Sequence, residues 1–193
     1  MGYTAPAQGT AGSVVTATIY NRDMIDNIAF LGVTHDHSGD TGDGGNLKRS
    51  SWTQPHYAEG SAVLSAERNR FGVSELLDTG IGALKWAISI PSNLEAIDKL
   101  AVVLDPEASG NINRRVGVHY GGVGESGTTH GTLTGTAAFT TVDDQIIEDS
   151  IAGHVGDIAA GDYLGVYYER YGATGGDTYS GTLNVLGLVM EWH

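Results

Sequence analysis

Between positions 84 and 90, large apolar residues alternate with smaller or polar ones. The apolar positions are Leu84, Trp86, Ile88 and Ile90. Because successive side chains of a β-strand point to opposite faces, this pattern predicts a strand with one buried face. The sequence Pro91-Ser92-Asn93 follows directly and ends the predicted strand.

Shorter runs of the same kind, separated by Gly, Pro, Asn and Asp, predict seven further strands. They lie near positions 71–77, 99–104, 113–120, 133–141, 145–151, 163–170 and 183–192. Adjacent apolar residues Val185 and Leu186 change the phase of the last run, which predicts a β-bulge. We expect the apolar faces to form one core that includes Trp86, Ile88, Val102, Val116, Val118, Val166 and Leu188.

Eight strands at this spacing suit the two Greek keys of a jelly roll. The predicted fold class is therefore mainly β, with a jelly-roll-like antiparallel β-sandwich over residues 51–193. An extended arm and one short α-helix are expected to precede it, within residues 1–50.

The helix is predicted near residues 17–31, where apolar residues follow a period close to 3.6. This stripe consists of Ile19, Met24, Ile28 and Leu31, and Gly32 ends the helix. A helix of about 15 residues is marginal alone, so its stripe needs a surface to cover it. The β domain, sister copies of the chain and a partner protein all remain open as that surface. We expect the stripe to serve attachment or oligomerisation.

Composition narrows the functional classes. The 29 glycines and 17% charged residues are typical of a many-stranded protein with glycine-rich connections, and the absence of cysteine excludes disulfides and thiol chemistry. The formal net charge of −13 repels a phosphate backbone, so we expect no nucleic-acid partner. No apolar run reaches the roughly 18 residues of a membrane-spanning helix, so we expect no membrane insertion.

A loop with two histidines follows the predicted helix. In extended backbone, His35 and His37 point to the same side, and three chains around a threefold axis would bring six imidazoles to one transition-metal ion. The alternative is that both histidines are solvated and that no cofactor is required. The acidic residues of the same loop miss the spacing of a calcium loop; they are Asp36, Asp40 and Asp43.

Other candidate motifs lack the context that their chemistry requires. The glycines of Gly122–Gly127 match a dinucleotide-binding pattern, but a strand rather than a helix is predicted after them. The acidic cluster at 143–149 suits either a solvated face or strand edge, or the paired carboxylates of glycoside hydrolysis, and we interpret it as a solvated face or strand edge. Tyrosines offer rigid amphipathic area for sugars or proteins, and the candidates for surface binding are Tyr167, Tyr171 and Tyr179.

Residues 15–31, followed by His-x-His-Ser-Gly and Asp-Gly-Gly, resemble the start of many tailed-bacteriophage virion proteins of the tail fibre, minor tail or head fibre type. This resemblance covers about residues 14–47. A looser one, over about residues 84–192, relates Gly161-Asp162 and Asp177-Thr178-Tyr179 to C-terminal jelly rolls of phage structural proteins. Trimeric phage spikes and fibres use His-x-His pairs to bind metal on the axis, which the resemblance implies for His35 and His37. The start of the loop also resembles the metallo-β-lactamase motif, but Asp40 lies one position late and the next histidine is missing.

These resemblances imply a structural protein of a phage or phage-like particle, without enzymatic activity. We expect a homotrimer at the virion surface, anchored to capsid or tail proteins by its N-terminus. Its β-sandwich would stabilise the particle or adhere to a glycan or protein of the host surface. Two alternatives remain: a carbohydrate-binding module with Trp and Tyr platforms, and a metal-dependent hydrolase built on the His-x-His loop.

Overall fold

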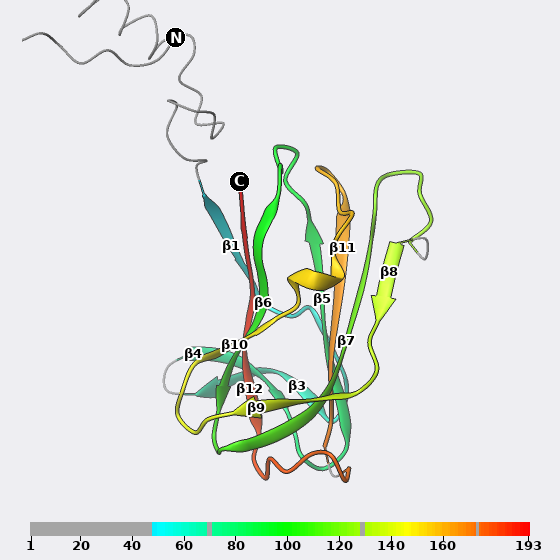
Figure 1. The fold of residues 1–193 in the computed structure, drawn as a ribbon. Coiled ribbons are helices and arrows are strands. Elements are labelled where there is room, and N and C mark those ends of the chain that lie inside the picture. The colour runs from blue at the N-terminus through cyan, green and yellow to red at the C-terminus, as the bar shows by residue number, and fades with distance from the viewer. Residues whose placement is uncertain (1–47, 69–70, 128–129, 173) are drawn as a thin grey trace, which may run out of the picture. The chain divides into compact units, whose positions relative to one another are not determined.

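The computed structural model describes residues 48–68, 71–127, 130–172 and 174–193. Within them, twelve strands form two antiparallel sheets that pack as a jelly-roll-like sandwich (Figure 1). Arg49–His193 forms one structural unit. The predicted arm, helix and loop lie outside the described residues, and so do the site residues assigned to them, which are Ile19, Met24, Ile28, Leu31, His35 and His37.

The first sheet, called sheet 1 below, is built around the C-terminal strand. Its order is β10-β6-β12-β4-β3, and β1 also pairs with β12. The strands are β1 (Arg49–Thr53), β3 (Ala62–Arg68), β4 (Phe71–Leu76), β6 (Ile97–Pro106), β10 (Ile147–Ser150) and β12 (Leu183–Trp192). Strand β4 pairs with the first residues of β12 and β1 with the last, so the two share one edge of that strand.

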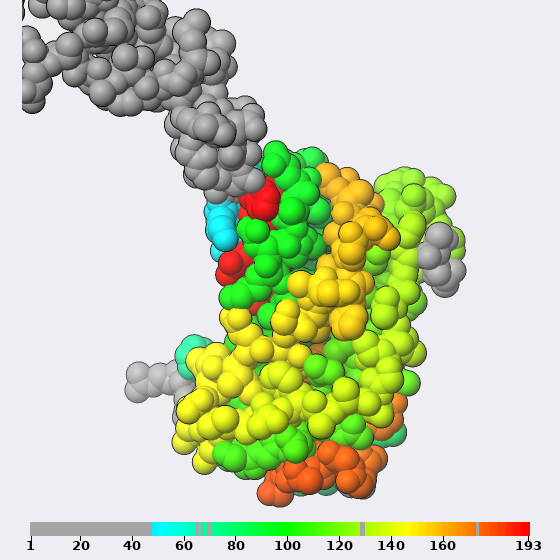
Figure 2. Space-filling view, in the orientation of Figure 1, coloured from blue at the N-terminus to red at the C-terminus, as the bar shows by residue number. Residues whose placement is uncertain are grey.

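The second sheet, called sheet 2, has the order β2-β5-β11-β7-β8, and β9 also pairs with β7. Its strands are β2 (Tyr57–Gly60), β5 (Ile81–Ser89), β7 (Gly110–Gly121), β8 (His130–Leu133), β9 (Ala137–Thr141) and β11 (Tyr163–Tyr171). A short 3₁₀ turn, η3 (Ala152–His154), lies between β10 and β11. In the view of Figure 2, the yellow segment that leads from β9 through β10 to η3 lies on the side of the molecule that faces the viewer.

The single strand predicted over 133–141 is wrong in one respect, because it is broken into β8 and β9. At the break, the Thr134 backbone N–H donates to the Val116 carbonyl oxygen (2.9 Å), and the Thr134 hydroxyl accepts from the Val116 N–H (3.0 Å). A side chain thus takes the place of a backbone acceptor. Two short strands thereby share the edge of one long, bent β7.

The core lies between the sheets and confirms most of the predicted apolar faces. Trp86, Val102, Val116, Val118, Val166 and Leu188 are all buried. Ile88 is only partly buried but packs against the same cluster. The Trp86 indole N–H donates to the Thr53 carbonyl oxygen (3.1 Å), which ties the core of sheet 2 to strand β1 of sheet 1.

The predicted bulge is confirmed in β12. Val185 lies opposite Leu104 and Gly187 lies opposite Val103, so Leu186 is the extra residue. Leu186 packs with Val103 and Val73 in a small apolar cluster separate from the main core. The bulge therefore places an additional large apolar side chain on the outer face of sheet 1.

The acidic cluster at 143–149 ends in an edge strand, as predicted, because β10 is the edge strand of sheet 1, but Asp149 is not solvated. This side chain is 2% exposed and accepts hydrogen bonds from Arg114 (2.5 and 2.8 Å) and from the Tyr168 hydroxyl (2.9 Å). Burial, reinforced by the Asp149 carboxylate, raises the pKa of Tyr168 well above its ordinary value. A solvated face is wrong for Asp149 because this residue faces the core from β10, whereas the adjacent Glu148 is exposed on the opposite face.

Candidate functional site: a groove on sheet 1

The outer face of sheet 1 has an apolar floor. Val73, Val103, Leu186 and Val189 come from β4, β6 and β12 and pack together there. An outer face of a two-layer sandwich is ordinarily polar, because only the inner face is covered. This floor is therefore not explained by the core of the sandwich.

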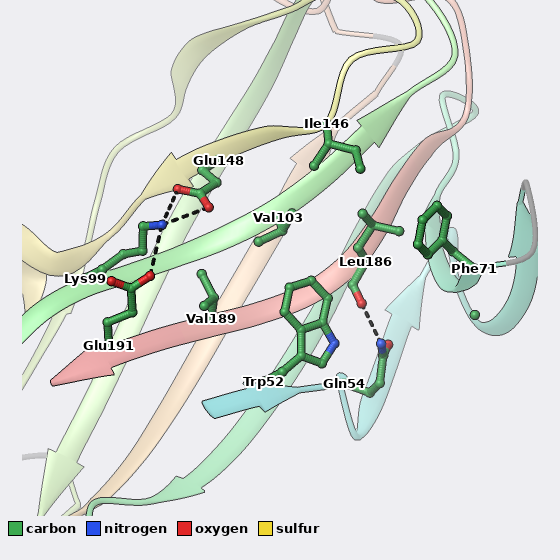
Figure 3. Close-up of a pocket in the computed structure, with 11 residues that line it drawn as sticks. Trp52, Gln54, Phe71, Lys99, Val103, Ile146, Glu148, Leu186, Val189 and Glu191 are labelled. Carbon is green, nitrogen blue, oxygen red and sulfur yellow. Dashed lines mark hydrogen bonds and ion pairs between the residues drawn. The ribbon is translucent and has the colours of Figure 1, made fainter. Parts of the chain in front are cut away.

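Two exposed aromatic rings stand beside the floor. The side chains of Trp52 and Phe71 are 52% and 48% exposed. Figure 3 shows both rings around the groove, with Leu186 between them. We call this region the Trp52 groove. Its volume of about 590 Å³ falls within the range of small-molecule sites.

The position of Trp52 depends on a glycine in the neighbouring strand. A Cβ atom at Gly187 would lie 2.9 Å from indole atoms Cε2 and Nε1 of Trp52, so no larger residue fits there without displacing the ring. Beyond the end of β1, the Gln54 amide donates to the Leu186 carbonyl oxygen (2.5 Å). Together these contacts hold the indole against the surface of β12.

The other end of the groove is charged. Lys99 of β6 lies between two carboxylates of the adjacent strands, 3.0 Å from Glu148 and 3.3 Å from Glu191 (Figure 3). Its hydrogen bonds, first to Glu148 and then to Glu191, raise the pKa of Lys99. All three side chains remain partly exposed, so their oxygens and ammonium protons are accessible to a ligand. The three carry a net charge of −1.

The groove combines flat apolar surface with fixed hydrogen-bonding groups. An exposed indole packs against the apolar C–H face of a ring, while carboxylates accept hydrogen bonds from hydroxyls and an ammonium donates them. This arrangement is chemically suited to a ligand that has both an apolar face and several hydroxyl groups.

The predicted surface tyrosines lie elsewhere. Tyr179 is wrong as a surface residue: it is 2% exposed, and its hydroxyl donates to the Thr182 carbonyl oxygen (2.7 Å) while its ring lies under the guanidinium of Arg170. Tyr167 and Tyr171 are half-buried on the outer face of sheet 2, where a binding role stays a prediction.

The remaining candidate motifs form no site of their own. Gly122–Gly127 leads from β7 toward β8, and Glu125 caps the Gly122 N–H (2.9 Å), as expected for a loop rather than a nucleotide site. The His130 ring stacks on Tyr120 with centroids 5.5 Å apart. Among the described residues, no group of three or more His, Cys, Asp or Glu side chains is arranged to hold a metal ion.

The sequence alone does not identify the groove residues as a site. Trp52 is a lone aromatic in the polar run Arg49-Ser50-Ser51-Trp52-Thr53-Gln54, which is the one signal that sequence reasoning can use. Phe71, Lys99 and Glu191 fall on three different strands, so only the strand pairing brings them together. No helix in the described part of the chain is long and apolar enough to cross a membrane.

Comparisons with known proteins give matches of structure only. No protein-family model matches the chain, and no curated protein matches it in sequence. A family 35 carbohydrate-binding module from Clostridium thermocellum aligns with 74% of the chain and 97% of its own length, at 13% identity and a TM-score of 0.44. An exo-β-1,3-galactanase from Phanerochaete chrysosporium, solved with galactose, aligns with 75% of the chain and 29% of its own length, at 12% identity and a TM-score of 0.42.

A third match is TmCBM61 in complex with β-1,4-galactotriose, which aligns with 85% of the chain and 93% of its own length at 10% identity and a TM-score of 0.36. The chain spans under a third of the galactanase. Because all three scores lie below 0.5, these matches assign no function to the chain.

Proposed function

We propose that this protein binds carbohydrate through the Trp52 groove. The observation that carries the proposal is the exposed indole of Trp52, held against β12 by the absence of a side chain at Gly187 and facing the same groove as Lys99. The indole supplies the stacking surface for a sugar ring, and the charged end supplies hydrogen bonds to its hydroxyls.

The charges of the groove indicate the class of glycan. Lys99, Glu148 and Glu191 sum to −1, and the whole chain has a formal net charge of −13. A uronate or sialate would meet like charge, whereas a neutral sugar would not. The ligand proposed is therefore a neutral oligosaccharide or polysaccharide.

The expected role in a particle is compatible with this site. The resemblance of residues 14–47 to virion proteins supports attachment of a homotrimer to capsid or tail proteins through residues 1–50, at the surface of a phage-like particle. Adhesion to a glycan of the host surface would then be the task of the groove. Particle association is tested separately, by asking whether deletion of residues 1–47 prevents copurification with particles.

Isothermal titration of the full chain tests the groove. The probes are cellohexaose, xylohexaose, mannohexaose and β-1,4-galactotetraose, which differ in sugar and linkage and are all neutral. We expect at least one to bind, and Trp52→Ala to weaken that binding by about tenfold or more, because about 1.4 kcal/mol of stacking is lost.

The matched control is Val63→Ala, since Val63 is also an exposed apolar residue of sheet 1 but does not line the groove. Its affinity should equal that of the unmodified chain. Failure of every probe to bind, or equal binding by Trp52→Ala, would contradict the proposal.

A further inference from the structure

The outer face of sheet 2 has a second hollow region, centred on β11. Tyr163, Gly165 and Tyr167 alternate on this face, so two tyrosines flank a residue without a side chain. At about 3.3 Å per residue, the two tyrosine Cα atoms are about 13 Å apart. Tyr163 is 59% exposed, so its ring is accessible to a ligand.

The neighbouring strands extend the hollow. Gly165 lies between Ala87 of β5 and His119 of β7, and Gly117 lies beside Tyr167. Two adjoining hollows of about 340 and 210 Å³ both include His119 and Gly165. We call the combined region the Tyr163 trough.

Its walls are held in place by packing and ion pairs. Lys85 lies 5.3 Å from the ring centroid of Tyr57 and 5.4 Å from that of Tyr167, and it also pairs with Glu59 (2.6 Å). A Cβ atom at Gly131 would lie 2.4 Å from His119 Nδ1, so the missing side chain leaves room for the imidazole over β8.

The charged residues of this face come close to balance. Lys85 pairs with Glu59 and Arg115 pairs with Glu169 (2.6 Å), while Glu125 also lines the smaller hollow, so these five side chains sum to −1. Such a face repels an anionic ligand and is complementary to an uncharged one. Two tyrosines whose Cα atoms lie about 13 Å apart, with a glycine floor between them, suit an extended ligand longer than one sugar ring.

We propose that the Tyr163 trough is a second carbohydrate site, which binds an extended neutral oligosaccharide. The inference rests on the proposed function for the chemistry of the ligand, but not on the Trp52 groove. Sheet 1 and sheet 2 turn their outer faces away from each other, so one chain would bind two glycans at once. A polymeric glycan would gain avidity from both sites.

The number of oligosaccharides bound per chain, measured by isothermal titration, tests the second site, because this number does not depend on the oligomeric state. With whichever of the four probes binds the full chain, we expect two oligosaccharides per chain. The variants Tyr163→Ala, Gly165→Leu and Trp52→Ala should each bind one oligosaccharide per chain. A Cβ at Gly165 meets only the His119 carbonyl oxygen, at 3.6 Å, so the leucine fits the strand and fills the trough.

Ile81→Ala is the control, since Ile81 is exposed on β5 on the same face but does not line either hollow. If one oligosaccharide binds per chain, and Tyr163→Ala and Gly165→Leu do not affect it, the site at the trough is overturned and the site at the groove stands. If one oligosaccharide binds per chain, both variants abolish its binding and Trp52→Ala retains it, the site at the trough is supported and the site at the groove is overturned. Absence of binding by all four probes would overturn both.

Discussion

The two outer faces of the sandwich are built on the same strand geometry but differ in which side chains cover them. On sheet 1, Val73, Ala101, Val103 and Leu186 point outward yet are at most 4% exposed, which is the burial of a core. On sheet 2, the corresponding surface is made of glycines, tyrosines and ion pairs. The groove on sheet 1 is thus formed by large apolar side chains on the outer face, and the trough on sheet 2 is formed where glycines leave side chains out.

This difference shows where function is encoded in a two-layer sandwich. The inner faces must be apolar for the domain to fold, so their pattern carries little functional information. Outer faces are free of that constraint, and departures from a polar surface point to a ligand or partner. The bulge at Leu186 and the glycine at 187 are such departures on β12.

The largest effect is expected from the core residue that lies behind both faces. Trp86→Ala removes a fully buried indole and its hydrogen bond to Thr53, so the free energy of unfolding should fall by about 3 to 5 kcal/mol. Denaturant unfolding measures this, and Trp86→Phe should cost less. If the free energy of unfolding of Trp86→Ala lay within about 1 kcal/mol of that of the unmodified chain, the strand register would be wrong.

A smaller change should separate the two faces. Gly187→Ala places a methyl group 2.9 Å from the Trp52 indole, so we expect the ring to shift and groove affinity to fall by about tenfold, with a stability loss of about 1 to 3 kcal/mol. Gly175→Ala is the control, because no atom lies within 4 Å of its Cβ. If Gly187→Ala binds the oligosaccharide at the Trp52 groove with unchanged affinity, Gly187 does not position Trp52.

The charged end of the groove should contribute less than the indole. Lys99→Met leaves Glu148 and Glu191 without their shared cation, and we expect a two- to fivefold loss of affinity for a neutral probe in isothermal titration.

The pH dependence of groove binding follows from the raised pKa of Lys99, because its ammonium persists through neutral pH. Affinity should be constant from about pH 7 to 9 and decline only above the ordinary lysine pKa of about 10.5. Titrations across that range check this, and a decline below pH 9 would contradict it.

The smallest effect is expected on sheet 2. Burial, then the hydrogen bond to Glu169, raises the pKa of Tyr167 to about 12. Because the folded state favours the neutral phenol, this contribution to stability is complete below about pH 10 and is lost as pH rises toward 12. The pKa values of Tyr168, Tyr171 and Tyr179 are raised as well, so an absorbance titration should show several late tyrosinates, of which Tyr167→Phe removes one. An unchanged number of late tyrosinates in that variant would contradict the assignment.

The sequence predicts the sandwich because alternation is strong in its inner strands, such as 84–90 and 183–192. It does not predict β3, and it does not predict β1 and β2, whose sequences Arg-Ser-Ser-Trp-Thr and Tyr-Ala-Glu-Gly lack a regular apolar face. Strands β1 and β2 form because they complete the hydrogen bonds of β12 and β5. Trp52 gains its place in the groove from the pairing of β1 with β12.

The same limitation explains the tyrosines. Tyr167 and Tyr179 look alike in sequence, yet the first borders the trough while the second is buried against Arg170. Strand pairing places Lys85 and Gly117 on either side of Tyr167, and no local pattern contains that information. A site assembled from four or five strands is therefore visible only after the register is known.

Tryptophan fluorescence provides the most direct test of the central claim, that a glycan binds against Trp52. The chain has three tryptophans, of which Trp86 and Trp192 are 2% and 8% exposed and Trp52 is 52% exposed, so acrylamide should quench mainly Trp52. A saturating oligosaccharide that binds the chain should protect this fluorescence from acrylamide, and Trp52→Phe should abolish the protection. Saturation with unchanged quenching of Trp52 would contradict binding at the groove.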